Sequence, residues 1–212
     1  MNKVFLFFGV LIIHIAAALL SIESLKIVSK VVLMPVLIWT VFAERKSYPH
    51  VSILILALVF SWLGDVLLIF DGQLYFILGL GAFLLAHLAY IFIYARHASL
   101  KLLRLWPFLG FVGLFCFGVL KDSLPPDLSV PVYFYMGVIS LMAYMASCRK
   151  VEGGGYEYVL IGAVLFIISD AFIAVNQFLA VVPFSVFWVM STYGLAQFLI
   201  VHGLLKKNLK VS

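Results

Sequence analysis

Long apolar segments separated by short polar ones follow one another along the whole chain. Each apolar segment is close to the length of about 20 residues that an α-helix needs to cross the hydrocarbon core of a bilayer. None shows the continuous alternation of a membrane barrel strand, and the breaks carry clusters of Pro, Gly and Asp that do not continue a helix without cost. The pattern predicts about eight membrane-spanning helices. They are expected at residues 4–21, 25–43, 51–70, 74–95, 105–121, 129–148, 157–176 and 182–204.

Composition supports a membrane protein. The chain has 212 residues, of which 66% are hydrophobic and 11% are charged, whereas a soluble domain carries about 25% charged residues. Eight helices leave room for short loops, so we expect an all-α integral membrane protein with a single polytopic domain over residues 1–212. The N-terminal stretch 3–21 resembles a signal peptide but has no convincing cleavage site, so we interpret it as the first span.

The basic residues give the orientation. Eleven of the 14 Lys and Arg residues lie on one side of the eight-helix arrangement, and only Lys26, Lys30 and Lys121 lie at or near the other. The positive-inside rule places that basic side, and with it both termini, in the cytoplasm. The net charge of +5 is explained by this topology, and no nucleic-acid partner is expected. We expect a multi-pass protein of the cell membrane, or of the inner membrane if the source is a Gram-negative bacterium.

Two segments of the chain resemble each other. Residues 58–65, Leu-Val-Phe-Ser-Trp-Leu-Gly-Asp, and residues 163–170, Ala-Val-Leu-Phe-Ile-Ile-Ser-Asp, each place an Asp five or six residues from the outer end of a span. Because four helices separate them, a duplicated four-helix unit would keep the same orientation. Two four-helix repeats are therefore one interpretation, and coincidence is the other.

Three ionisable side chains lie within the predicted spans. Asp65, Asp170 and Lys30 fall at a similar depth in the outer half, where a charged side chain costs on the order of 2.5–3.5 kcal/mol and usually marks a site. They could form an ion pair that only holds helices together, but this leaves one carboxylate without a partner. Two nearby carboxylates in a medium of low dielectric constant tend to provide one protonated acid and one ionised base. We favour this functional interpretation, with Asp65 and Asp170 as catalytic candidates.

Further polar residues mark one face of two spans. His87 and Tyr90 share a helical face with Phe83 and Tyr94, and Tyr193 and Gln197 are spaced i, i+4. Their structural alternative is hydrogen bonding between helices, worth about 1 kcal/mol. The substrate-binding or orienting candidates are Lys30, Ser61, His87, Tyr90, Tyr193 and Gln197. No pair of His residues has the spacing of a zinc hydrolase, so we expect neither a metal nor another cofactor.

Five stretches resemble the YhhN-type membrane proteins, a family that includes the vertebrate lysoplasmalogenases. They appear in the family's order and cover nearly the whole chain. They are residues 29–35, 60–68, 79–90, 162–170 and 192–197. Two positions depart from the family pattern: Pro35 lies five residues after Lys30 instead of next to it, and Gly194 stands where a second Tyr is common. The first departure bears on the role of Lys30, and the second could widen the pocket.

The resemblance implies a hydrolase that cleaves the vinyl ether bond of a lysoplasmalogen, releasing a fatty aldehyde and a glycerophospho-alcohol. Protonation of the vinyl β-carbon gives an oxocarbenium ion that water captures, a problem that glycosidases solve with two carboxylates. We therefore expect a lysophospholipid substrate within membrane lipid and acid/base chemistry from two buried Asp residues. The alternative is a small transporter or lipid-binding protein that uses the same charges. The sequence leaves the oligomeric state open.

Overall fold

A computed structural model describes residues 3–43, 49–150 and 154–206. The described residues form eight α-helices. They are α1 (Lys3–Leu19), α2 (Glu23–Ala43), α3 (Val51–Leu67), α4 (Gln73–Ala95), α5 (Trp106–Gly113), α6 (Pro126–Ser147), α7 (Tyr156–Phe178) and α8 (Ser185–Leu205). A short 3₁₀ turn, η1 (Leu102–Arg104), precedes α5, and a π-helical segment, η2 (Leu114–Leu120), continues it.

The helices agree with the segments that the sequence predicts. All eight expected segments are helical, and the described residues contain no β-strand, so the all-α class is confirmed. Six helical stretches are long and apolar enough to cross a membrane; α1 and α3, at 17 residues each, are shorter. The number of membrane crossings remains a prediction, as does the internal repeat.

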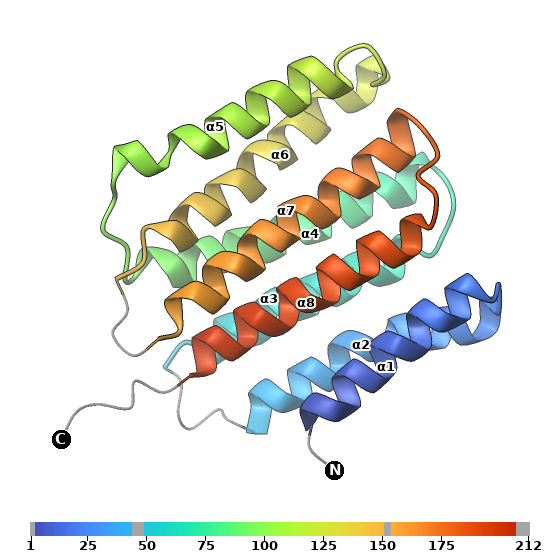
Figure 1. Cartoon of the computed structure of the whole chain (residues 1–212), viewed down its shortest axis with the longest axis horizontal. Helices are drawn as coiled ribbons and strands as arrows, with labels where there is room; N and C mark the ends of the chain where they lie inside the picture. The colour runs from blue at the N-terminus through green and yellow to red at the C-terminus, as the bar shows by residue number, and fades with distance from the viewer. Residues whose placement is uncertain (1–2, 44–48, 151–153, 207–212) are drawn as a thin grey trace.

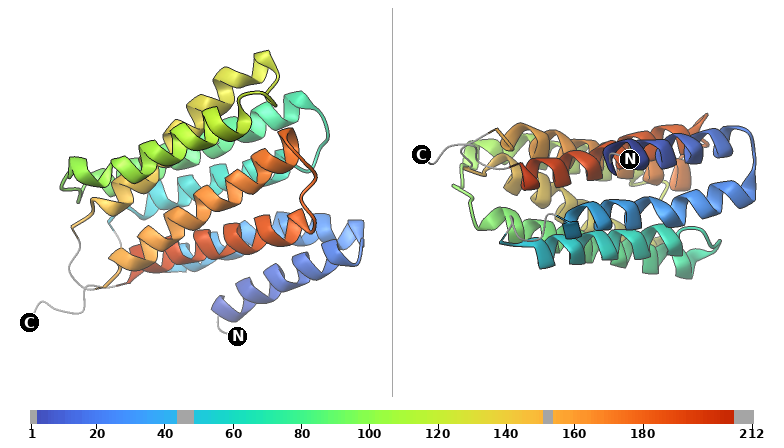
Figure 2. Two further views of the ribbon diagram at one scale, coloured as in Figure 1. Left: turned by 45° about the horizontal axis from the view of Figure 1, so that its top comes forward. Right: turned by 90° about the horizontal axis from the view of Figure 1, so that it is seen from below.

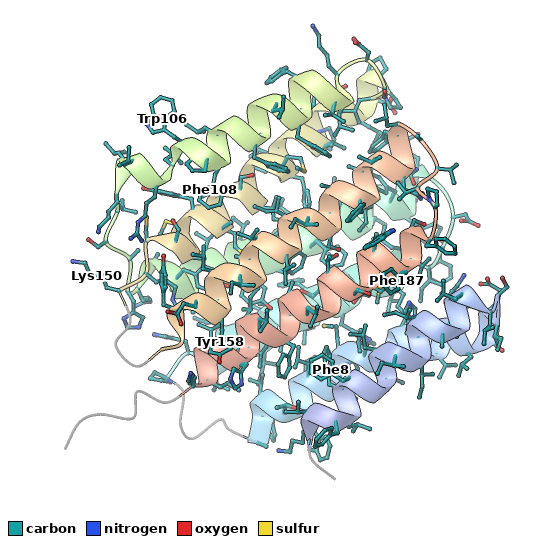
Figure 3. The ribbon with its side chains drawn as sticks, in the orientation of Figure 1. Phe8, Trp106, Phe108, Lys150, Tyr158 and Phe187 are labelled. Atoms are coloured by element: carbon teal, nitrogen blue, oxygen red, sulfur yellow. The ribbon has the colours of Figure 1, made fainter. Side chains whose placement is uncertain are left out.

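Seven helices form a closed ring, and α5 lies outside it. Neighbours around the ring are α1, α2, α3, α4, α6, α7 and α8, with α8 returning to α1. All run roughly parallel to one long direction (Figure 1), and the view from below shows α1 and α8 in one layer with α2 and α3 in the other (Figure 2). Helix α5 packs mainly on α6, and its Trp106 points away from the bundle (Figure 3).

One end of the bundle collects the basic residues, and we call it the basic end. Helix α1 begins there and α8 ends there (Figure 1), and Lys3 and Lys206 line the same groove. The loops after α4 and α6 also meet there, because the Ser99 N–H donates to the Cys148 carbonyl at 2.8 Å. Arg45, Lys46, Lys207 and Lys210 lie outside the described residues. An arrangement with α1 beginning and α8 ending at the same end agrees with the sequence, and the cytoplasmic orientation of that end remains a prediction.

A proline fixes the register of α2 against α3. Pro35 lies inside α2 and has no N–H, so the Val31 carbonyl one turn earlier loses its usual partner within the helix. The indole N–H of Trp62 on α3 donates to that carbonyl at 2.9 Å. In an apolar medium a carbonyl without a hydrogen bond is costly, and the bond from Trp62 gives the Val31 carbonyl the partner that it lacks within α2. The neighbouring residue on α2, Lys30, interacts electrostatically with Asp65 on α3.

Glycine lets α7 and α8 approach closely. A Cβ at Gly162 would lie 2.8 Å from the Ala196 carbonyl oxygen and 3.0 Å from the Ile200 nitrogen, both on α8. Small residues at such crossings permit the close packing that drives association of helices in membranes. The close approach of α7 and α8 brings their polar side chains into the same part of the bundle.

Candidate active site

The first buried carboxylate is Asp65, near the end of α3. It is 3% exposed, and the Tyr193 hydroxyl on α8 donates to its Oδ2 atom at 2.6 Å. A hydrogen bond to a carboxylate is stronger than one between neutral groups because one partner can be ionised. The contact therefore ties α3 to α8 across the ring.

A set of hydrogen bonds lies on the basic-end side of Asp65. The Tyr90 hydroxyl on α4 donates to Gln197 Oε1 at 2.6 Å, and Gln197 Nε2 donates to Ser61 Oγ at 2.9 Å. All three side chains are fully buried. Both amide atoms of Gln197 therefore have hydrogen-bond partners. The three buried side chains fill the interior on the basic-end side of Asp65.

The second buried carboxylate is Asp170 on α7, which is 7% exposed. The Tyr135 hydroxyl on α6 donates to its Oδ2 atom. His87 Nε2 on α4 lies 2.9 Å from the same hydroxyl and 3.7 Å from Asp170 Oδ2. Within the described part of the chain, Nδ1 of this buried imidazole has no hydrogen-bond partner. Asp170, Tyr135 and His87 thus form a compact group that can hold and exchange a proton.

Two phenylalanines, Phe83 and Phe166, lie between the two carboxylate groups, and we call them the aromatic partition. The Phe166 ring centroid lies 5.4 Å from that of Tyr193 and 4.7 Å from that of His87, so it contacts both groups. Phe83 can pack against α3 because residue 64 is glycine; a Cβ there would lie 2.6 Å from the Phe83 ring. Each carboxylate has its own tyrosine partner, and the two carboxylates interact electrostatically.

A cavity of about 380 Å³ opens at the end of the bundle opposite the basic end, and we call it the mouth cavity. Its polar lining includes Glu23, Lys26, Lys30, Asp71, Asn176 and Gln177. His14 also lines it, where its Nδ1 atom lies 3.1 Å from Ser29 Oγ. The mouth cavity therefore offers both signs of charge to a polar ligand.

A narrow apolar pocket adjoins the mouth cavity. It has a volume of about 30 Å³, and Leu68, Phe76 and Ile173 line both spaces. Asp170 and Tyr135 form its polar wall, and Leu80, Val132 and Met136 belong to its apolar wall. Asp170 is therefore a polar group in the wall of an apolar pocket that adjoins a polar cavity.

Lys30 faces the mouth cavity and acts on Asp65 at a distance. The two side chains interact electrostatically, and Lys30 makes no ion pair within 4.0 Å among the described residues. Lys30 lines the mouth cavity, and Asp170 lines the narrow pocket. Asp65 is not among the described residues that line either space. The three ionisable residues expected at one depth therefore have different surroundings.

Most of the candidates from the sequence lie in these groups. Tyr193 contacts Asp65, Gln197 joins Ser61 to Tyr90, and His87 approaches Asp170. Tyr135 and His14 are not among the candidates predicted from the sequence. For Tyr135 a signal existed, because it lies well inside a predicted span, whereas membrane tyrosines prefer the interfaces.

The ring of apolar helices and its buried polar interior define a multi-pass α-helical membrane protein with two carboxylate groups beside an amphiphilic cavity. Such ionisable groups inside a membrane protein normally line a site or a pathway. Comparison with known proteins identifies the family within this class. The chain belongs to the YhhN family, which matches residues 25–204.

The chain is similar to two kinds of vertebrate protein. It is 32% identical over 161 residues to the lysoplasmalogenase TMEM86A of Homo sapiens, covering 73% of this chain and 65% of that protein. It is 33% identical over 144 residues to the lysoplasmalogenase TMEM86B of Sus scrofa, covering 68% of this chain and 59% of that protein. The matched region thus spans less than two thirds of these relatives' own length. No solved structure matches the fold.

Proposed function

We propose that this protein is a lysoplasmalogenase-like hydrolase. It cleaves the vinyl ether bond of a lysoplasmalogen and releases a fatty aldehyde and a glycerophospho-alcohol. The similarity to lysoplasmalogenases supports the kind of reaction. The structural observation that carries the proposal is that Asp170 lines the narrow apolar pocket, which shares three lining residues with the polar mouth cavity.

The two spaces match the two parts of the substrate. A phosphate in the mouth cavity would meet the ammonium group of Lys30, whereas that of Lys26 is already paired with Glu23 at 2.5 Å. The alkenyl chain would enter the narrow pocket along Val132 and Met136. That pocket holds about two water-sized spheres in this conformation, so chain binding requires adaptable side chains such as Met136 to move aside. With the head group and chain so placed, the vinyl ether lies beside Asp170.

In the first step, protonated Asp170 gives its proton to the β-carbon of the vinyl ether. Tyr135 and His87 both approach Oδ2, so Oδ1 carries the transferred proton. The C=C π electrons form the new C–H bond, and the ether oxygen shares the resulting positive charge as an oxocarbenium ion. The Asp170 carboxylate left behind stabilises this cation, as the carboxylates of glycosidases do.

In the second step, water adds to the carbon bonded to oxygen and returns a proton to Asp170, with His87 placed to assist. The product is a hemiacetal, whose C–O bond to glycerol breaks to give the aldehyde and the free alcohol. One water is consumed, and Asp170 ends protonated, as it began. Asp170 thus acts first as a general acid and then as a general base.

Asp65 has a different part in this proposal. It lies behind the aromatic partition and interacts with Lys30, so it sets the field at the head-group phosphate and the cation without touching either. Which carboxylate supplies the proton is tested directly by comparing the two Asp→Asn variants.

The alternative is a transporter or a lipid-binding protein, and the buried bonds on the basic-end side of Asp65 argue against a transport path. Tyr90, Gln197 and Ser61 have no exposed surface and hold one another by hydrogen bonds. A transporter must open its site to both sides in turn. The mouth cavity opens opposite the basic end, as expected for an enzyme that takes its substrate from one side.

The decisive experiment measures aldehyde release from lysoplasmenylcholine and lysoplasmenylethanolamine by the purified full-length protein. In D₂O, protonation of the β-carbon places one deuterium on the aldehyde carbon next to the carbonyl. Immediate borohydride reduction preserves this label for mass spectrometry. The ester analogue, lysophosphatidylcholine, should not be cleaved.

Asp122→Asn is the matched control, because Asp122 is an exposed carboxylate outside both cavities. It should release aldehyde like the wild type, whereas Asp170→Asn should not. If folded wild-type protein releases no aldehyde from either lipid, the hydrolase proposal is wrong, and uptake or binding assays decide the alternative. Release without the deuterium label would contradict the protonation step.

A further inference from the structure

A third cavity lies at the basic end, away from both carboxylate groups. It is a groove of about 210 Å³ between α1, α2 and α8, which we call the basic-end groove. Its walls are mostly apolar and include Phe7, Leu37, Phe198 and Leu205. Phe198 packs against Phe8 of α1 at 4.8 Å between ring centroids, and Figure 3 labels Phe8 where α1 faces α8. The groove is thus a slot between helices that offers apolar surface to a chain-like ligand.

The rim of the basic-end groove is positively charged. Lys3 and Lys206 both line it, together with His202, and no carboxylate is among its described lining residues. The Lys3 ammonium lies 5.3 Å from the centre of the Trp39 ring, and the Lys206 ammonium lies 4.7 Å from that of Tyr158. Lys206 also donates to the Gly154 carbonyl at 3.3 Å. These contacts place the Lys3 ammonium over α2 and the Lys206 ammonium near the start of α7, and none of them neutralises either charge.

The combination of an apolar slot and a cationic rim fits an amphiphile with a negative head group. Basic pockets between transmembrane helices on the cytoplasmic side bind anionic lipid head groups. A second copy of the chain would bring another basic surface, and a zwitterionic lipid would add a positive charge beside the lysines. Charge complementarity therefore selects an anionic phospholipid.

We propose that the basic-end groove is a binding site for an anionic phospholipid of the adjacent leaflet. Its phosphate lies between the ammonium groups of Lys3 and Lys206, and one acyl chain lies along Phe7, Leu37 and Phe198. Because the lipid contacts both the first and the last helix, it stabilises the closure of the ring between α1 and α8. This site is separate from the proposed substrate site, so it does not depend on the hydrolase activity.

The test measures retention of dioleoyl phosphatidylglycerol by the purified full-length protein in detergent, by native mass spectrometry during titration. Dioleoyl phosphatidylcholine is the neutral comparison. Wild type should retain one phosphatidylglycerol in clear preference to phosphatidylcholine. The Lys3→Gln/Lys206→Gln variant should bind it about 25-fold more weakly, since each lysine near a lipid surface contributes a factor of about five.

The matched control is Lys101→Gln/Lys150→Gln. It removes the same charge from loops at the same end but outside the groove, and it should keep the wild-type affinity. A second variant, Thr40→Trp, keeps both lysines and fills the groove from α2; it should also lose binding. Thermal melting should rise with phosphatidylglycerol for the wild type and the control, and for neither groove variant.

Three results would overturn the proposal. Equal retention of both lipids by wild type would show that charge does not select the ligand. An equal loss in the Lys101/Lys150 control would show a general charge effect of the basic end. Competition by sn-glycerol 3-phosphate at an affinity similar to that of the lipid would mean a phosphate site that does not use the groove.

Discussion

The two buried carboxylates share one local arrangement and differ in what surrounds it. Asp65 and Asp170 each accept a hydrogen bond from a tyrosine on another helix, Tyr193 and Tyr135 respectively. Asp170 lines the narrow pocket and has His87 beside it, whereas Asp65 is backed by the buried bonds of Gln197 and faces Lys30 at a distance. In our proposal, lining a pocket, more than residue type, is what separates the carboxylate that reacts from the one that acts on it through space.

The largest expected effect comes from the accessible carboxylate. Asp170→Asn removes the proton donor in our proposal, and general acid catalysis contributes on the order of 10²–10⁴-fold. We expect kcat to fall by that factor while the fold in detergent is kept. Steady-state aldehyde release measures it, and unchanged turnover in this variant would exclude Asp170 as the acid.

The sealed carboxylate should matter less. Asp65→Asn removes a charge that acts on Lys30 through space, so we expect a loss of kcat/KM on the order of ten- to a hundredfold. A double-mutant cycle with Lys30→Gln sharpens the comparison: if Asp65 works through Lys30, the double variant is no slower than the slower single variant. Additive losses would instead mean that Asp65 acts on the reacting atoms by a separate route.

The two tyrosines allow a matched test of the two groups. Tyr135→Phe and Tyr193→Phe each delete one hydroxyl that donates to a carboxylate. Each should lower the free energy of unfolding by about 1 kcal/mol, the usual value of a hydrogen bond between membrane helices. Only Tyr135→Phe should also lower kcat, because its partner meets the substrate. Unfolding in mixed micelles, followed beside turnover, separates the two effects, and a larger kcat loss for Tyr193→Phe would reverse our assignment.

The smallest effect is expected in the bonds on the basic-end side of Asp65. Ser61→Ala leaves Gln197 Nε2 without its acceptor and should cost about 1 kcal/mol of stability. Turnover at saturating substrate should stay within about twofold, because this set lies away from the reacting bond. A large loss of kcat without a loss of stability would indicate that Ser61 contacts the substrate.

The sequence predicted the helices well because bilayer thickness leaves few choices for an apolar segment of suitable length. It also identified Asp65, Asp170 and His87, since ionisable groups in such segments are conspicuous. It did not show which of them share a cavity. That depends on side chains from helices distant in the sequence, such as Phe166 on α7 standing between Tyr193 of α8 and His87 of α4.

Tyr135 shows the second reason for incomplete prediction. Its position inside a span is a signal, but the span holds several aromatic residues, and the sequence does not show which of them meets a polar partner. Its hydroxyl becomes significant when α6 packs beside α4 and α7 and brings Asp170 and His87 to it. Pro35 departs from the family pattern in the sequence, but the bond from Trp62 to the Val31 carbonyl appears only with α3 in place.

The short helices α1 and α3 bear on the shape of the surrounding bilayer. At 17 residues each and 1.5 Å per residue, they span about 26 Å, against about 30 Å of hydrocarbon. As membrane-crossing helices they create a negative hydrophobic mismatch, which lipids relieve by thinning locally and flanking residues by extending to the interface. Both helices flank α2, which contributes Lys26 and Lys30 to the mouth cavity. With the eight membrane crossings that the sequence predicts, thinning on this side would draw the lipid head groups inward toward the cavity, and the proposed single-chain substrate would have a shorter distance to leave its monolayer.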